Sequence, residues 1–536
     1  MNSTKRRLAG AMFVLGITLT FSYSTLSAQV YTDLHDLNNV DGSVDCGVSP
    51  LIQGRDGNLY GTLCSGGTNG KGVVFKITPT GSYSVLYNFD DIHGSLPKGI
   101  TLGSDGKFYG TTLLGGLHNL GTFYKITSSG TLTVLHDFTG VLPDGGNPFA
   151  PPIQGVDGNF YGTDQNYLGT QYYVYQATPT GDIHVIGRAP GYSLSSLTER
   201  PGFGFYGTTP AAGAFGEGTI FHVAETSTVV FNFDQTHGRT PEGGLVLGDD
   251  GNFYGTAPYG GEDLGQGSGG VLFRVSPGGA MKVMHSFVGP ADRGTTPSAG
   301  LAQASNGSFY GVTVIGGTGE GVAFVFTPKR AYSQPYFFDG THGGHPFQTP
   351  VQHSNGRIYG VAAGGAHNAG AIYSIDYGLP SGVRLVRAGG QVGQTIGVLG
   401  QGFTRTTKVQ FANDAAQFTV VSDRFLTAIV PPTIAAPRVV VSTPSGILES
   451  NQKFILQPVI SSFSPESGPP GTQVTIIGSG LRGVADITFR NIKASFVLDS
   501  DSQITATVPL NARTGRIRAT TIAAKGTSAG MFQVVP

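Results

Sequence analysis

The chain has 536 residues, of which 85 are glycine, 10% are aromatic and only 12% are charged, and its formal net charge is -1. This length exceeds what one compact core can use, so two or more domains are expected. The balanced charge gives no electrostatic reason to expect nucleic acid or an anionic lipid surface as a partner. The aromatic residues give the chain enough apolar surface to form a buried core. The many glycines therefore indicate turns rather than disorder.

Residues 1–28 have the pattern of a signal peptide. Lys5, Arg6 and Arg7 form a positive start, residues 8–21 form a short apolar run, and Ala28 is the expected last residue before cleavage. The apolar run is shorter than the roughly 20 residues that a spanning helix needs, so removal is expected rather than anchoring. The mature chain is therefore predicted to have no transmembrane span and to lie outside the cell or at its surface.

The two cysteines, Cys46 and Cys64, lie on either side of a turn expected at residues 56–58. A hairpin at this turn would bring the two residues roughly opposite each other. An oxidising compartment would favour a disulfide between them. The alternative is two unlinked, partly buried thiols, and the sequence leaves both open.

A repeated unit of about 50 residues extends to residue 378. Its clearest phrase is DGNFYGT at residues 157–163 and again at 250–256, and seven copies occur in all, with tyrosines at Tyr60, Tyr109, Tyr161, Tyr206, Tyr254, Tyr310 and Tyr359. In the fifth unit, four strands are expected at residues 244–248, 253–257, 271–275 and 281–287. Four short strands without helical periodicity are typical of a propeller blade, and the tyrosines are expected to pack between blades.

The fourth unit departs most from the repeat. Glu199, Arg200 and Pro201 replace the residues that approach the turn in the other units. This difference predicts a distorted blade at that place.

The two ends of the repeat region predict a closed ring. The seventh unit ends after a third strand at residues 371–377, whereas residues 30–37 (VYTDLHDL) resemble the fourth strands at 83–89 and 131–138. The N-terminal strand would complete the last blade and remove both open edges. The alternatives are a linear solenoid, which predicts no such missing and spare strand, and two smaller sheets. The propeller is assigned to residues 29–378.

The YGT phrase, GVVFKITPTG at residues 72–81 and SVLYNF at 84–89 resemble the GloVer-type tandem repeat of exported bacterial proteins. The resemblance covers residues 30–378. That family carries no assigned catalytic residues, so the resemblance implies architecture and location only.

The C-terminal part contains two copies of one module. Residues 393–431 align without a gap with residues 471–509, and the copies are assigned to residues 379–457 and 458–536. Their size and short alternating strands favour β-sandwiches. The second copy, through SPESGPPGT at 464–472 and IGSGL at 477–481, is similar to the IPT/TIG immunoglobulin-like domain, which implies a spacer or protein-contact role. The predicted fold is thus all-β: a seven-bladed β-propeller closed by its N-terminal strand, followed by two Ig-like β-sandwich domains.

Binding is expected on one face of the propeller. Turns between strands one and two, and three and four, are short and share one face, whereas the longer two-to-three loops and blade connections share the other. Varied loops on a regular scaffold are the usual place for a ligand. The candidate residues there are Asp90, His93, His118, Asp234, His237, Asp339, His342 and His367.

In three blade connections Asp and His lie three residues apart, at Asp90 and His93 and at two equivalent pairs. Such pairs suit metal binding or acid–base chemistry. They equally suit an Asp that caps the turn and a His that hydrogen-bonds locally. Copies in different blades are too far apart to share one ion, so the local role is favoured, and no metal or cofactor is predicted.

These observations favour an exported binding or adhesion protein over an enzyme, with an extracellular glycan or envelope protein as partner and the Ig-like modules as spacer. The alternative is an extracellular carbohydrate-active enzyme, a lyase or glycoside hydrolase, on the same face. Such an enzyme should place two carboxylates, or a base and a charge-stabilising group, near the central channel. A purely structural role in an envelope assembly is the third hypothesis.

Overall fold

The computed structural model describes residues 30–536, apart from residues 262–267, 289–293, 328, 330 and 434–435 and the side chains of residues 45–48 and 268. The expected signal peptide at residues 1–28 lies outside the described residues. The described chain is all-β, and its one helical element is the three-residue 3-10 turn η1 (Phe403–Arg405). No helix in this part of the chain is long and apolar enough to cross a membrane.

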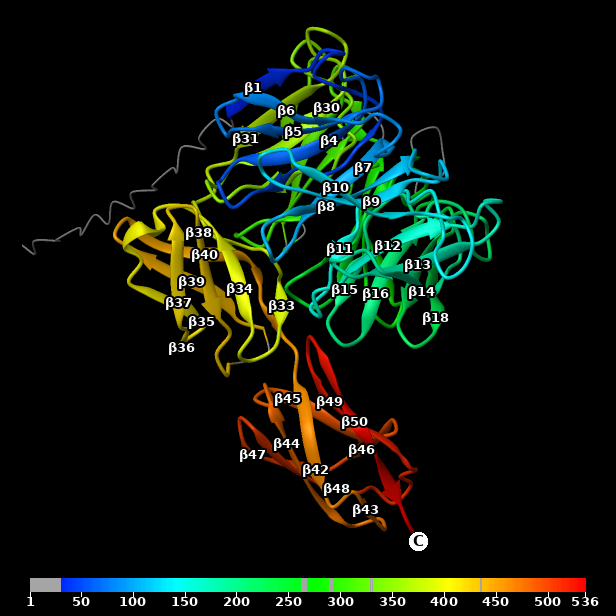
Figure 1. Cartoon of the computed structure of the whole chain (residues 1–536), viewed down its shortest axis with the longest axis vertical. Coiled ribbons are helices and arrows are strands. Elements are labelled where there is room, and N and C mark those ends of the chain that lie inside the picture. Colours follow the sequence, from blue (N-terminus) through cyan, green and yellow to red (C-terminus); the bar gives the residue numbers. More distant parts are fainter. Residues whose placement is uncertain (1–29, 262–267, 289–293, 328, 330, 434–435) are drawn as a thin grey trace, which may run out of the picture.

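The repeat region forms seven main antiparallel sheets, numbered here in chain order (Figure 1). Sheet 1 contains β2 (Ser43–Val48), β3 (Ile52–Gln53), β4 (Leu59–Ser65), β5 (Val73–Ile77) and β6 (Tyr83–Asn88). Sheet 2 contains β7 (Ser95–Leu102), β8 (Phe108–Leu114), β9 (Thr122–Ile126) and β10 (Leu132–Asp137). Sheet 3 contains β11 (Ile153–Gln154), β12 (Phe160–Gln165), β13 (Tyr172–Ala177) and β14 (Ile183–Ala189).

Sheet 4 contains β15 (Thr198–Arg200), β16 (Gly204–Thr209), β17 (Thr219–Val223) and β18 (Ser227–Asn232). Sheet 5 contains β19 (Val246–Leu247), β20 (Phe253–Ala257), β21 (Ser268–Val275) and β22 (Met281–Val288). Sheet 6 contains β24 (Ala302–Gln303), β25 (Phe309–Thr313), β27 (Val322–Phe326) and β28 (Tyr332–Phe337). The short β23 (Gly294–Thr295) pairs with β26 (Ile315–Gly316). The four strands predicted for the fifth unit are present, with the first shorter and the third longer than expected.

Sheet 7 is completed by the start of the described chain. It contains β29 (Val351–Gln352), β30 (Ile358–Ala362), β31 (Ala371–Asp376) and β1 (Val30–Asp36), and β1 pairs antiparallel with β31 as the sequence predicted. The Arg357 guanidinium supports this pairing, because it donates to the Val30 carbonyl at 3.2 Å and to the Thr32 hydroxyl at 2.8 Å.

Each YGT tyrosine is buried. It packs against the next sheet, on the residue that stands directly before that sheet's own YGT tyrosine. Ring centroids lie 4.3 Å apart for Tyr60 and Phe108, 4.1 Å for Tyr109 and Phe160, 4.0 Å for Tyr161 and Phe205, 4.3 Å for Tyr206 and Phe253, and 4.2 Å for Tyr254 and Phe309. At the remaining interfaces, Tyr310 shares a buried cluster with Ile358, and Tyr359 shares one with Leu59. The series of contacts therefore returns from sheet 7 to sheet 1.

The glycine of each YGT phrase leaves room for an aromatic side chain of the third strand. A Cβ atom on Gly255 would lie 2.6 Å from Cζ of Phe273, and one on Gly61 would lie 2.7 Å from Cζ of Phe75. Real Cβ atoms do not approach neighbours this closely, so the repeat requires glycine here for packing rather than for a turn.

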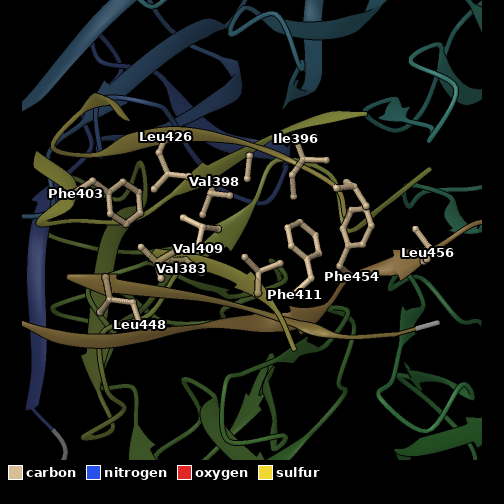
Figure 2. Packing of buried hydrophobic residues seen from close by; sticks show 14 residues of the cluster. Val383, Ile396, Val398, Phe403, Val409, Phe411, Leu426, Leu448, Phe454 and Leu456 are labelled. Carbon is tan, nitrogen blue, oxygen red and sulfur yellow. The ribbon is translucent and has the colours of Figure 1, made fainter. Parts of the chain in front are cut away.

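Two modules follow the repeat region. One sheet of the first module contains β32 (Arg384–Leu385), β34 (Thr395–Leu399), β38 (Phe425–Ile429) and β37 (Phe418–Ser422). The facing sheet contains β36 (Asp414–Ala415), β35 (Lys408–Phe411), β39 (Arg438–Thr443) and β40 (Gly446–Lys453). In addition, β33 (Gly389–Gly390) pairs parallel with β41 (Ile455–Leu456). Its buried core includes Val398, Phe411 and Phe454 (Figure 2).

The second module repeats this arrangement. Its sheets are β42 (Val459–Ser464), β44 (Gln473–Ser479), β48 (Gln503–Thr507) and β47 (Phe496–Ser500), and β43 (Ser467–Gly468), β50 (Lys525–Val534), β49 (Gly515–Thr521), β45 (Val484–Phe489) and β46 (Ile492–Ala494). Phe489 and Phe532 pack in its core.

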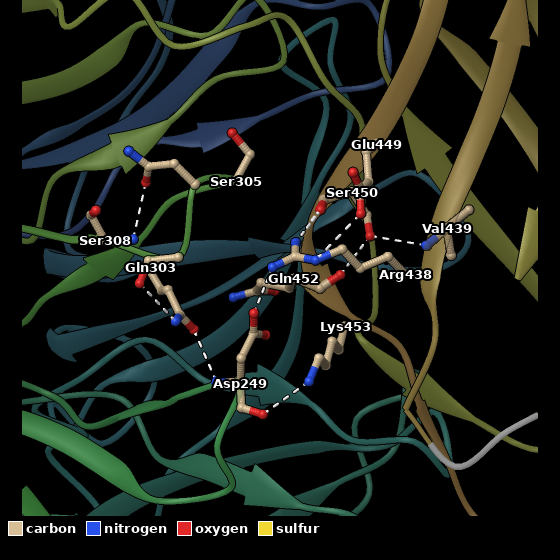
Figure 3. Close-up of polar contacts among 12 residues, drawn as sticks. Asp249, Gln303, Ser305, Ser308, Arg438, Val439, Glu449, Ser450, Gln452 and Lys453 are labelled. Atoms are coloured by element: carbon tan, nitrogen blue, oxygen red, sulfur yellow. Dashed lines mark hydrogen bonds and ion pairs between the residues drawn. The ribbon is translucent and has the colours of Figure 1, made fainter. Parts of the chain in front are cut away.

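The first module contacts the turn face, which we define as the face formed by the turns between first and second strands, such as residues 54–58 and 248–252. Arg438 pairs with the Asp249 carboxylate at 2.5 Å, and the Lys453 ammonium donates to the Asp249 carbonyl at 3.1 Å (Figure 3). The Arg387 guanidinium donates to the Val156 carbonyl at 2.8 Å.

The second module meets the departing fourth unit. The Lys525 amide donates to the Pro201 carbonyl at 3.1 Å, and Arg518 pairs with Glu225 at 3.1 Å. Gly202 has a positive φ of 74°, and a Cβ there would lie 1.7 Å from the Lys525 carbonyl oxygen. The unusual sequence of the fourth unit is thus explained by its contact with the second module.

A cavity of about 440 Å³ remains between the turn face and the modules, and Glu199, Asp249, Arg387, Lys453 and Ile522 contribute to its lining. Burial raises the pKa of the Glu199 carboxyl to about 7, although this carboxylate accepts a hydrogen bond from the Val156 amide at 3.0 Å and lies near Arg387. Glu199 therefore stays protonated up to a higher pH in the folded protein than a carboxyl group in water does.

Replacing a YGT glycine should destabilise the repeat region. We expect Gly255→Ala to cost about 1–3 kcal/mol, because the added methyl group overpacks the contact with Phe273. Thermal unfolding measures the change. Gly278→Ala is the matched control, since the nearest atom, Ser276 Oγ, would lie 3.9 Å from its Cβ. Equal melting temperatures for the two variants would contradict the packing role.

The raised pKa of Glu199 predicts a pH-dependent stability. Its contribution is fully present below the usual value of 4.5 and is lost as the pH rises through about 7. Glu199→Gln should therefore raise the melting temperature at pH 8 and reduce the fall in stability between pH 5 and pH 8, with each kcal/mol worth about 2–4 °C. The exposed Glu466→Gln serves as control and should leave the wild-type pH profile unchanged.

Candidate functional site

The three Asp–His pairs lie on the face opposite the turn face, which we call the loop face, and each pair is closed on itself. The Asp90 carboxylate accepts from the His93 amide at 2.9 Å and bonds its ring Nδ1 at 2.8 Å. Asp234 forms the same two bonds with His237, at 2.8 Å to the amide and 2.8 Å to ring Nδ1. Asp339 forms them with His342, at 3.0 Å to the amide and 2.9 Å to ring Nδ1. The carboxylates thus order their own turns.

The structure does not bring the candidate residues of different connections together. The pairs belong to the separate links between sheets 1 and 2, 4 and 5, and 6 and 7. His118 and His367 are exposed in the loops from β8 to β9 and from β30 to β31. Within the described residues, no group of three or more His, Cys, Asp or Glu side chains could hold a metal ion.

Cys64 of β4 is part of a disulfide. The other cysteine of the chain is Cys46 in β2, whose side chain lies outside the described residues. The strands β2 and β4 pair antiparallel, through Ser43 with Ser65 and Val48 with Leu63. The backbone therefore places both cysteines on neighbouring strands of sheet 1.

A cavity of about 440 Å³, here called the mouth cavity, lies where the sheet-to-sheet connections enter the first strands. All seven sheets contribute to its lining. Leu197, Thr198 and Leu245 line both this cavity and the one at the turn face, so the two cavities lie end to end. The modules consequently cover the end opposite the mouth.

Equivalent positions of the repeat supply the polar and aromatic lining of the mouth cavity. In each sheet, one residue of the first strand pairs with the YGT tyrosine, as Thr101 does with Tyr109 and Val351 with Tyr359. Lys98 and Gln348 each lie three residues before this partner residue. Phe149, Glu242 and Phe347 each lie four residues before such a residue. One repeated backbone path thus directs different side chains toward one space.

Two charged groups in this lining lack a counter-charge. Lys98 is half-buried and makes no ion pair within the described part of the chain, and burial lowers the pKa of its ammonium group. Burial raises the pKa of Glu242, and the Ser298 hydroxyl partly offsets this shift. Lys98 and Glu242 form no ion pair with each other among the described residues.

Gln348 is the least expected lining residue. It is only 2% exposed, and neither its amide nitrogen nor its amide oxygen has a hydrogen-bond partner among the described residues. An unpartnered buried amide is costly, so a ligand that completes its hydrogen bonds is favoured at this position.

Two other buried carboxylates lie outside the mouth cavity. Asp164 and Asp144 of the third unit are 1% and 3% exposed, and burial raises the pKa of Asp164 well above its usual range. His136 bonds Asp144 at 2.7 Å, and the Gly145 amide donates to Asp164 at 3.2 Å. Neither carboxylate belongs to the lining of the mouth cavity.

Sequence reasoning selected the loop face and missed Lys98, Glu242, Gln348, Phe149 and Phe347. The signal was present in the repeat itself. Once the seven copies are aligned on their tyrosines, the position of Lys98 and Gln348 is Ser, Lys, Ala, Ser, Gly, Ala and Gln in turn. Such variation beside constant strands indicates side chains that do not serve the packing.

Comparisons with known proteins agree with the all-β repeat architecture. The family described as Gloeobacter/Verrucomicrobia repeat matches residues 18–176 and 143–292, and the IPT/TIG domain matches residues 458–533. No curated protein matches the chain.

Several solved structures resemble the chain at low identity. A fungal alcohol oxidase of the AA5 family in complex with copper is 13% identical, with 95% of this chain and 100% of that chain covered and a TM-score of 0.43. The WD40 β-propeller domain of Doa1 is 12% identical, covers 64% of this chain and 96% of its own, and has a TM-score of 0.40.

SGBP-B from a xyloglucan utilization locus in Bacteroides uniformis is 20% identical over 27% of this chain, with a TM-score of 0.15. The chain spans 46% of that protein, less than half its length. At these identities and scores, no activity is transferred from any of the three proteins. The repeat-family match, by contrast, extends over residues 18–292, just over half of the sequence. The chain therefore belongs to the Gloeobacter/Verrucomicrobia repeat family and carries an IPT/TIG domain at its C-terminal end.

Proposed function

We propose that this protein is an exported, surface-located binding protein that holds part of a glycan or of an envelope protein in the mouth cavity. The observation that carries the proposal is the unpartnered amide of Gln348, which is buried in the lining of that cavity; Lys98, which has no ion-pair partner among the described residues, belongs to the same lining. A pocket with few convergent polar groups on a rigid scaffold is the usual form of a binding site.

In this proposal the seven sheets are the blades of a closed seven-bladed propeller at residues 29–378. The cyclic tyrosine contacts, the pairing of β1 with β31 and the contribution of all seven sheets to one cavity support it. Two Ig-like domains follow, at residues 379–457 and 458–536. Residues 1–28 are the proposed signal peptide.

The composition of the mouth cavity supports binding rather than hydrolysis. Glu242 is the one carboxylate in its described lining. A glycoside hydrolase needs two carboxyl groups on either side of the scissile bond. The eight loop-face residues predicted from the sequence, such as Asp90 and His93, are proposed to order the surrounding connections and to contribute at most to the rim of the site.

Gln348→Met tests the proposal, because it removes the amide but nearly keeps the volume. We expect the melting temperature to stay the same or rise, since relieving an unpartnered buried group gains about 1–3 kcal/mol. We expect affinity to fall by about tenfold, which corresponds to about 1.4 kcal/mol. Residues 29–536 would be screened against plant and bacterial polysaccharides, and hits measured by calorimetry.

His237→Ala is the matched control, because His237 is bonded within its own turn and lies outside the mouth cavity. It should bind like the wild type. A glycan that binds both variants as tightly as the wild type would place the site elsewhere. Turnover of a bound glycan, lost in Glu242→Gln, would replace the proposal with the enzyme hypothesis.

A further inference from the structure

The charges of the mouth cavity narrow the class of its ligand. Lys98 lies within β7, the first strand of sheet 2, and its ammonium group lacks a carboxylate partner among the described residues. A partly buried, unpaired cation is unfavourable in the free protein. An anionic group on the ligand would remove this cost, so the site favours an anion next to Lys98.

Glu242, another lining residue of the mouth cavity, favours a different kind of ligand group. It belongs to the connection into sheet 5, whereas Lys98 belongs to sheet 2, and the two residues form no ion pair among the described residues. A carboxylate accepts strong hydrogen bonds from hydroxyl groups. The ligand should therefore combine one anionic group with hydroxyl donors at a distance from it.

The remaining lining suits a ring with apolar faces. Phe149 and Phe347 occupy the same repeat position in sheets 3 and 7, and both are partly exposed. Aromatic rings offer large apolar contact area at low entropic cost. The Gln348 amide adds one acceptor and two donors for ring hydroxyls. A cavity of about 440 Å³ holds one or two sugar residues rather than a folded partner.

We propose that the mouth cavity binds a uronate residue of an acidic polysaccharide, with the sugar carboxylate at the Lys98 ammonium and the ring hydroxyls at Glu242 and Gln348. This inference rests on the proposed glycan-binding function and names its ligand class. The cation selects the acidic sugar, and the other polar groups hold any sugar.

The test compares acidic with neutral oligosaccharides of equal length. Oligogalacturonate and oligoalginate are titrated against cello- and xylo-oligosaccharides by calorimetry, at low and at high salt. We expect the acidic probes to bind about tenfold or more tightly, equivalent to about 1.4 kcal/mol, and to weaken with salt.

Lys98→Met should remove this preference without harming the fold, because it replaces an unpaired charge with an apolar chain of similar length. Acidic probes should lose about tenfold or more in affinity, and neutral probes should change by less than about twofold. Lys282→Met, an exposed lysine on the outer strand β22, removes the same charge far from the mouth and should leave all affinities unchanged.

The outcomes separate the two proposals. Equal binding of neutral and acidic probes, with loss of both in Gln348→Met, would overturn the uronate assignment and keep the glycan-binding function. If Lys282→Met weakened the binding of acidic probes as much as Lys98→Met does, the preference for acidic probes would come from the overall charge of the protein. That result would overturn the uronate assignment as well. Absence of binding by every oligosaccharide would overturn the uronate assignment and the glycan-binding function, and would leave an envelope protein as the proposed partner.

Discussion

The contact of each YGT tyrosine with the next sheet is the interaction on which the rest of the structure depends. A four-stranded sheet exposes two apolar faces and cannot be stable alone. The tyrosine covers one face by packing on the residue before the next tyrosine, and the following glycine admits an aromatic ring of the third strand. Because the last such contact joins Tyr359 to Leu59, every sheet has two neighbours.

Closing the series also requires the start of the chain. Tyr31 of β1 stacks on Tyr336 of sheet 6 with centroids 4.4 Å apart and lies 5.6 Å from Tyr373 of sheet 7. The N-terminal strand thus belongs both to the hydrogen bonding of sheet 7 and to the packing between sheets 6 and 7. A strand that closes a ring removes two edges that could otherwise pair with other chains.

The repetition that builds the sheets also builds the mouth cavity and the docking surface. Positions that pack between sheets remain large and apolar or are glycine, whereas positions three or four residues before the partner of a YGT tyrosine carry Lys98, Glu242 and Gln348. The opposite face carries the modules. Contacts such as Arg438 with Asp249 and Lys525 with Pro201 hold both modules against the turn face, so any spacer role starts from a fixed attachment.

The sequence by itself indicated seven copies of one phrase, the four strands of the fifth unit, the spare N-terminal strand and the doubled C-terminal module. These features depend on local periodicity and on repetition, which a linear reading detects. Only the tertiary structure decided which side chains meet. Asp90 and His93 are close in sequence and bond each other, whereas Lys98 and Gln348 are 250 residues apart and line one cavity because sheets 2 and 7 both contribute to it. The role of the fourth unit required the same information, since Gly202 is explained by Lys525.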